Sequence, residues 1–255
     1  MTDDEPIRLT STSVAQEDAP PDPDGFDFDA FERAIVPLGV PHDPYYVIPK
    51  GNPDGTDKIV PYKPAIRDIA KVTGICLHQT ACVMGESPAR YRRMSVHFVV
   101  TLGGVCIQMC DVLALLYGGD LWNAGCVHIE TDGAYAGLED DPSTLAKRED
   151  VETFWANGPV KAPMQVTPAA MRTLRNLERY IIELVRRRGG GIRVIVAHRQ
   201  ASASRPSCPG QAIWQHGAVP ILEEYGLSDG GPGFKLGGGR ALPDAWTGQA
   251  NGIRY

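Results

Sequence analysis

The spacing of hydrophobic and polar positions changes near Arg67, and this change divides the chain. From there to about Tyr225, short runs of β-branched and aliphatic residues alternate with segments of helical periodicity, which is typical of an α/β protein. The runs predict strands at Thr73–Leu77, Val96–Leu102, Val105–Met109, Val127–Glu130 and Ile192–Ala197. The two glycines of Leu102-Gly-Gly-Val105 indicate a hairpin between the second and third of these strands.

Two helices are predicted after the strand-rich part. Thr167 followed by Pro168 is typical of an N-cap and a first helical position. The apolar residues that follow recur at helical spacing: Met171, Leu174, Leu177, Ile181, Ile182, Leu184 and Val185. Gly189-Gly-Gly191 ends this helix, and a second helix is predicted from Gln211 to about Tyr225.

The same patterns divide the chain into four parts. Residues 1–25 are acidic and rich in proline, and they predict a disordered arm. Residues 26–66 contain aromatic residues and prolines with little periodicity, and we expect them to be an extension that packs on the main domain. The main domain is predicted to span residues 67–226. Residues 227–255 are rich in glycine and predict a tail packed on the surface.

Composition and charge narrow the class of protein. A chain of 255 residues that is 43% hydrophobic can bury a full core. Its formal net charge of −6 argues against a general nucleic-acid binder, because phosphate contacts need clustered Lys and Arg. No apolar run approaches the length of a membrane span, and the start of the chain has no features of a secretory signal. We therefore expect a protein made in the cytoplasm without membrane insertion, with its six cysteines reduced.

Three residues that are distant in sequence are candidates for one metal site. His78 ends the apolar run that begins at Val72, His198 ends the run that begins at Val194, and Cys208 follows His198 in the next loop. The sheet holds a side chain at the end of a buried strand rigidly, so two such ends can face one pocket. Two imidazoles and one thiolate leave a tetrahedral Zn²⁺ with one open position, as in catalytic rather than structural zinc sites. Hydrolysis by metal-activated water is the leading hypothesis.

Four segments around these residues carry a family resemblance. They are Leu77-His-Gln-Thr-Ala81, Ser95–Val100 with the hairpin, Asn123–Glu130, and Ala197–Gly210 followed by Trp214. In this order, from about Arg67 to Tyr225, they resemble the motifs of the zinc-dependent N-acetylmuramoyl-L-alanine amidases of type 2. That family includes phage endolysins, peptidoglycan-recognition proteins and cytosolic anhydro-muropeptide amidases.

The resemblance implies a central mixed β-sheet flanked by helices. It also implies a substrate bond, the amide between the lactyl group of N-acetylmuramic acid and L-alanine. It assigns His78, His198 and Cys208 to Zn²⁺, and Glu130 to the general base. Arg205 is then expected to stabilise the oxyanion, and Thr80, Tyr117 and Asn123 to contact substrate, although Thr80 is equally compatible with a plain structural hydroxyl.

Departures from the family pattern keep other hypotheses open. Val96 stands where many members carry Tyr, Pro206 where they carry Lys, and Tyr117 in place of a histidine. These differences motivate a second hypothesis, a peptidoglycan-binding module with weakened turnover. A third is a structural component of a phage tail or secretion apparatus, with the corresponding proteins as partners. An active enzyme would act on cell-wall peptidoglycan after release or delivery, as endolysins and antimicrobial effectors do, or on cytosolic muropeptides.

Two further histidines lie in predicted strands. His97 is expected to be a hydrogen-bonded core residue. His128 shares a strand face with Glu130, because residues i and i+2 of a strand point to the same side. Its side chain either joins the site or packs in the core, and the sequence leaves both interpretations open.

Overall fold

The structure is a computed structural model that describes residues 25–37, 48–50, 60–62, 65–91, 94–139, 141, 144 and 163–247. All but the last residue of the predicted 1–25 arm, and the end of the chain from residue 248, lie outside this part. The statements below concern the described residues.

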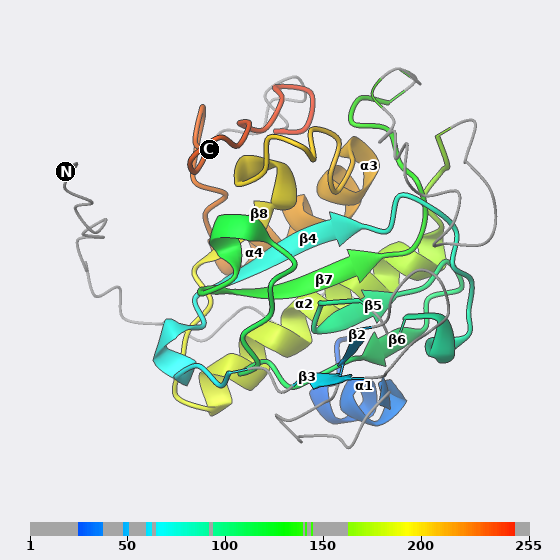
Figure 1. Cartoon of the computed structure of the whole chain (residues 1–255), viewed down its shortest axis with the longest axis vertical. Helices are drawn as coiled ribbons and strands as arrows, with labels where there is room; N and C mark the ends of the chain where they lie inside the picture. The colour runs from blue at the N-terminus through cyan, green and yellow to red at the C-terminus, as the bar shows by residue number, and fades with distance from the viewer. Residues whose placement is uncertain are drawn as a thin grey trace.

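A six-stranded sheet forms the centre of the molecule, with strand order β1-β6-β5-β7-β4-β8 (Figure 1). The strands are β1 Val36–Pro37, β4 Gly74–Gln79, β5 Phe98–Val100, β6 Cys106–Gln108, β7 Cys126–Thr131 and β8 Val194–Ala197. β4 pairs in parallel with both β7 and β8, whereas β5 and β6 form the predicted antiparallel hairpin. β2 Ile48–Lys50 and β3 Val60–Tyr62 form a separate two-stranded sheet. The predicted α/β class with a mixed sheet is therefore confirmed.

The helices follow the predicted order. α2 spans Pro168–Arg187, and the Thr167 hydroxyl caps it by accepting a hydrogen bond from the Ala170 N–H at 3.0 Å. The second predicted helix consists of α3 Gln211–Ile213, a π-helical segment Trp214–Ala218 and α4 Val219–Tyr225. The 3₁₀ turns are Ile69–Lys71, Pro88–Tyr91, Asp120–Trp122 and His198–Gln200. Within the described ranges, no helix has both the length and the apolar character needed to cross a membrane.

Strand alternation gives the central sheet two different faces. Ile75, Leu77, Val127 and Ile129 point to one face and join the apolar side of α2 in the main core, as the path of α2 across the sheet in Figure 1 indicates. The register of β4 with β7 pairs Cys76 with His128 and His78 with Glu130. Paired residues of neighbouring strands share a face, so these four polar or sulfur-containing residues lie on the face away from α2.

The predicted extension contains regular structure that its weak periodicity did not reveal. α1 spans Phe28–Ala34 and packs on α2, with the Phe28 and Tyr180 rings 4.8 Å apart between centroids. β1 adds a parallel edge strand beside β6. Both elements are short, so neither contains enough apolar positions for a repeating pattern.

The expectation that the Gly-rich tail packs only on the surface is wrong for Trp246. This side chain is fully buried and lies in the main core, with its ring centroid 6.3 Å from that of Trp214. A single aromatic residue among glycines has no periodicity, so the sequence pattern does not distinguish a buried anchor from a surface residue.

α2 carries one buried acid, Glu178. Neither of its carboxyl oxygens has a hydrogen-bond partner within the described structure. Burial raises its pKa from 4.5 to about 8, although Arg175 and Arg179 act in the opposite direction. Because the folded-state pKa is the higher one, the contribution of the neutral carboxyl to stability is fully present below pH 4.5 and is lost as pH rises through about 8.

Replacing Glu178 by Gln should remove this pH dependence, because the amide stays neutral. Relative to the Glu178→Gln variant, the wild-type free energy of unfolding should fall by up to about 1.4 kcal/mol per pH unit across the window. Denaturant unfolding at about pH 5, 7 and 9 measures the difference. Glu223→Gln, at an exposed position of α4, is the control. Parallel curves for wild type and Glu178→Gln would contradict the account.

Candidate active site

The two predicted ligand histidines lie side by side at one edge of the sheet. His78 is near the end of β4, and His198 comes directly after β8, its parallel neighbour. The carboxyl ends of parallel strands meet at the same edge, where ligand sites of α/β proteins commonly lie. The two Nδ1 atoms are 3.0 Å apart. Both side chains are buried.

Cys208 completes this group from the loop after His198. Backbone hydrogen bonds fix the loop: the Cys208 N–H donates to the Arg205 carbonyl, and the Arg199 N–H donates to the Cys208 carbonyl, both at 3.2 Å. The ligand atoms of His78, His198 and Cys208 all lie within 4.8 Å of one another. Like the other five cysteines, Cys208 is buried and forms no disulfide in the described chain. The structure thus brings together the three residues that the sequence selected.

The environment favours neutral imidazoles in this group. Burial, followed by the neighbouring His198 and His128, holds the pKa of His78 well below 6.5. Burial also lowers the pKa of His198, while Asp120 acts in the opposite direction. A neutral imidazole keeps a lone pair on one ring nitrogen, as metal binding requires. Two such nitrogens and one sulfur at this separation fit the donor set of a catalytic zinc site.

Each histidine is held on its outer side as well. The His198 Nε2 lies 3.3 Å from the Asp120 carboxylate, and the His78 Nε2 lies 3.1 Å from the His128 Nδ1. Asp120 has φ of +53°, which is uncommon for a residue with a side chain. Asp120 is not predicted by the sequence pattern, because an acidic residue in a loop has no periodicity that would place it beside a strand end 78 residues away.

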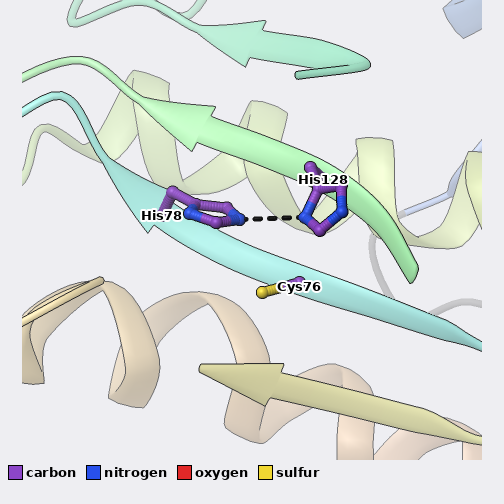
Figure 2. A group of neighbouring side chains, drawn as sticks. All are labelled: Cys76, His78 and His128. Carbon is purple, nitrogen blue, oxygen red and sulfur yellow. Dashed lines mark hydrogen bonds between the residues drawn. The ribbon is translucent and has the colours of Figure 1, made fainter. Parts of the chain in front are cut away.

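A second group shares His78. The ligand atoms of Cys76, His78 and His128 also lie within 4.8 Å of one another, and Figure 2 shows the His78 and His128 rings facing each other from β4 and β7. Cys76 and His128 are both completely buried, whereas His198 contacts the half-exposed Asp120. The His78–His198–Cys208 group is therefore the better candidate for exchange with solvent and substrate. His128, left open by the sequence, joins the site as a neighbour of His78.

The two predicted catalytic side chains lie near this group. Glu130 is paired with His78 in the β4–β7 register, points to the same face and is buried. Arg205 is partly exposed and close enough for its charge to lower the pKa of both His78 and His198. A carboxylate and a guanidinium thus flank the His/Cys group. Their catalytic roles stay predictions.

The three predicted substrate contacts differ in their surroundings. The buried Thr80 hydroxyl donates to protein oxygens, including the Cys82 carbonyl at 2.6 Å, and accepts from the Gly133 N–H, so it already supports a loop. The Asn123 side-chain oxygen accepts from the Gly119 N–H at 2.8 Å and closes the 119–123 turn. Tyr117 is 64% exposed. Of the three, Tyr117 has the side chain most accessible to substrate.

His97 is confirmed as a hydrogen-bonded core histidine. It is fully buried, its Nδ1 accepts from the His128 N–H at 2.9 Å, and its Nε2 lies 2.9 Å from the Ala114 carbonyl oxygen. With Nδ1 accepting, the ring proton is on Nε2 and donates to that carbonyl.

The fold and the site define a class: an α/β protein with a buried His/Cys donor group at the carboxyl edge of a mixed sheet. The family model for N-acetylmuramoyl-L-alanine amidase matches residues 68–211, which is more than half of the chain, and the chain belongs to this family. By this membership the protein is an amide hydrolase of peptidoglycan.

Solved structures give further similarities. The endolysin amidase LysCS from Clostridium intestinale URNW is 15% identical, with a TM-score of 0.46, and the match covers 76% of this chain and 96% of that chain. The Ph2119 endolysin from the Thermus scotoductus MAT2119 bacteriophage is 17% identical, with a TM-score of 0.39 and coverage of 76% and 99%. Drosophila peptidoglycan recognition protein SA is 12% identical, with a TM-score of 0.39 and coverage of 65% and 86%. The search of curated proteins finds no match.

Gly119 leaves room for the His128 ring, which makes the site sensitive to one added methyl group. A Cβ at this position would overlap the ring, although the backbone, with φ of −128° and ψ of 22°, is open to alanine. Gly119→Ala should therefore lower the free energy of unfolding by about 1–3 kcal/mol through overpacking.

Gly125→Ala is the matched control, because its Cβ would meet the Thr73 hydroxyl at an ordinary 3.5 Å. Denaturant unfolding of both variants gives the comparison. Equal stabilities of the Gly119→Ala and Gly125→Ala proteins would show that the His128 ring is not packed against this turn.

Proposed function

We propose that the chain is a zinc-dependent N-acetylmuramoyl-L-alanine amidase whose metal ligands are His78, His198 and Cys208. The observation that carries the proposal is the convergence of the three donor atoms within 4.8 Å at the carboxyl edge of the sheet. These residues come from β4, from the start of the turn after β8, and from the following loop. A bound Zn²⁺ supplies Lewis acidity toward a carbonyl oxygen and lowers the pKa of a water molecule.

Glu130 acts as the general base in this proposal. It is buried on the strand next to that of His78 and points to the same sheet face, so its carboxyl group lies on the same side of the sheet as the His78 ring. A carboxylate in this place takes the proton of the attacking water and passes it to the leaving amine of L-alanine. Because Glu130 first accepts a proton and then donates it, hydrolysis needs no second acidic residue.

Arg205 stabilises the negative charge that develops on the amide oxygen. The positive charge of its guanidinium lowers the pKa of both ligand histidines, and the Arg205 side chain is partly exposed. A fixed donor is most effective where charge appears only in the transition state. Arg205 therefore takes the place of the lysine that the family pattern carries at Pro206.

The substrate is peptidoglycan or a soluble muropeptide fragment. The exposed Tyr117 ring offers an apolar surface with a polar tip to the sugar or stem peptide. Asn123 closes the 119–123 turn, and Thr80 holds the loop at Gly133. The protein acts on the cell wall after release or delivery, or on muropeptides in the cytoplasm. A role beside phage-tail or secretion proteins is a second candidate, and stable assembly with such proteins without cell wall would favour it.

Digestion of purified muramyl peptides should release free stem peptide only when metal is available. A chelator should abolish the release and added Zn²⁺ should restore it, because the metal ion would polarise the amide carbonyl and activate water. Cys208→Ala should lose metal and activity together. Mass spectrometry of the digest identifies the cut bond. Intact substrate in the presence of zinc-loaded protein would instead support a peptidoglycan-binding module.

Glu130→Gln separates the general base from the metal site. The variant keeps the shape of the side chain and should lower kcat about 10²–10⁴-fold, since the amide cannot accept the proton. Its zinc content, measured by atomic emission, should equal that of wild type. Glu183→Gln, on the solvent side of α2, is the control for loss of a carboxylate. A Glu130→Gln enzyme with wild-type kcat would exclude this residue as the base.

A further inference from the structure

Several contacts fix the orientation of the His128 ring. Its backbone N–H donates to the His97 Nδ1, and its carbonyl accepts from the His97 N–H at 3.0 Å. The two rings are stacked at 5.6 Å between centroids, with 23° between their planes. On another side the ring lies against Gly119, where a Cβ would overlap it. A ring held in this way can direct its Nδ1 at one target.

That target is the outer nitrogen of His78. The His128 Nδ1 lies 3.1 Å from the His78 Nε2, and Figure 2 shows this contact between the two strands, with Cys76 beside it on β4. The other nitrogen of His78 faces His198 at 3.0 Å. His78 is therefore held between one imidazole on its inner side and one on its outer side.

The geometry determines where the ring protons lie without metal. His198 Nε2 faces the Asp120 carboxylate, which only accepts hydrogen bonds, so the neutral ring carries its proton on Nε2. The His198 Nδ1 then accepts, and His78 must donate to it from Nδ1. This leaves the His78 Nε2 as an acceptor, which requires His128 to donate from its Nδ1.

We propose that His128 is a positioning residue for His78 and that it changes tautomer when His78 binds a metal through Nδ1. The lone pair on the His78 Nδ1 becomes available only if the ring proton moves to Nε2. From there it donates to the His128 Nδ1, which must now accept, so His128 carries its own proton on Nε2. Each ring keeps one proton, and the net charge of the pair is unchanged.

The inference rests on the proposed role of His78 as a metal ligand. A ligand histidine whose second nitrogen is hydrogen-bonded has a fixed tautomer and ring orientation, and loss of such an outer partner typically weakens metal binding about 10–100-fold. His128 holds this place for His78, as Asp120 does for His198. The His128 Nε2 is buried and has no hydrogen-bond partner in the described part of the chain, so it can lose or gain the proton without breaking another contact.

The test compares Zn²⁺ affinities of the full chain by competition with a chromophoric chelator. His128→Leu fills a similar volume without an acceptor and should weaken Zn²⁺ binding about 10–100-fold. His128→Asn places an amide oxygen near the position of Nδ1 and should restore most of that affinity. Cys76→Ser changes a buried neighbour of the same cluster that is not the hydrogen-bond partner of His78, and it should bind Zn²⁺ like wild type.

A spectroscopic measurement distinguishes a tautomer change of His128 from a purely structural role of this residue. Nitrogen-15 NMR of the histidine rings should show His128 protonated on Nδ1 without metal and on Nε2 with one equivalent of Zn²⁺. The His97 ring, whose partners do not change, should keep its tautomer in both states.

The outcomes are distinguishable. A wild-type chain that binds no Zn²⁺ would overturn the proposed metal ligands and this inference with them. Wild-type affinity in a folded His128→Leu protein, or an unchanged His128 tautomer, would overturn the inference alone. Two equivalents of Zn²⁺ in wild type, one of them lost in Cys76→Ser, would also overturn it, because Cys76, His78 and His128 would then form a second metal site.

Discussion

The parallel pairing of β4 with β7 and β8 is the constraint on which the rest of the structure depends. It places the ends of β4 and β8 at one sheet edge, so that His78 and His198 face each other at 3.0 Å. It also sets a register in which Glu130 lies opposite His78 and His128 lies opposite Cys76. A shift by one residue would turn these side chains into the α2 core and lose the site.

Because successive side chains of a strand point to opposite sides, the two faces of the sheet have different roles. The face toward α2 is mainly apolar and supplies the burial that stabilises the domain. The opposite face bears the His78 and His128 imidazoles, whose pKa values are lowered by burial, and the buried Glu130 side chain. Rigid packing on the first face therefore holds the side chains of the second in fixed positions, as a preorganised catalytic site requires.

Much of this could be predicted from the sequence, for identifiable reasons. The main strands and α2 have clear periodicity, and His78 and His198 end apolar runs, so the sheet edge and the donor group follow from strand pattern and spacing. Asp120, α1 and the buried Trp246 could not be predicted, because each depends on one contact made by a loop or a short segment. The contact between His128 and His78 needed the register of two strands, which periodicity alone does not give. The predicted domain boundaries and residue roles stay predictions.

The most direct measurement of the central claim is an anomalous difference map of zinc-loaded crystals, recorded on both sides of the zinc absorption edge. One peak is expected, bonded to the Nδ1 atoms of His78 and His198 and to the sulfur of Cys208, at distances of about 2.0–2.1 Å for Zn–N and about 2.3 Å for Zn–S. A peak bonded to Cys76 and His128 instead, or none near His78, would contradict it.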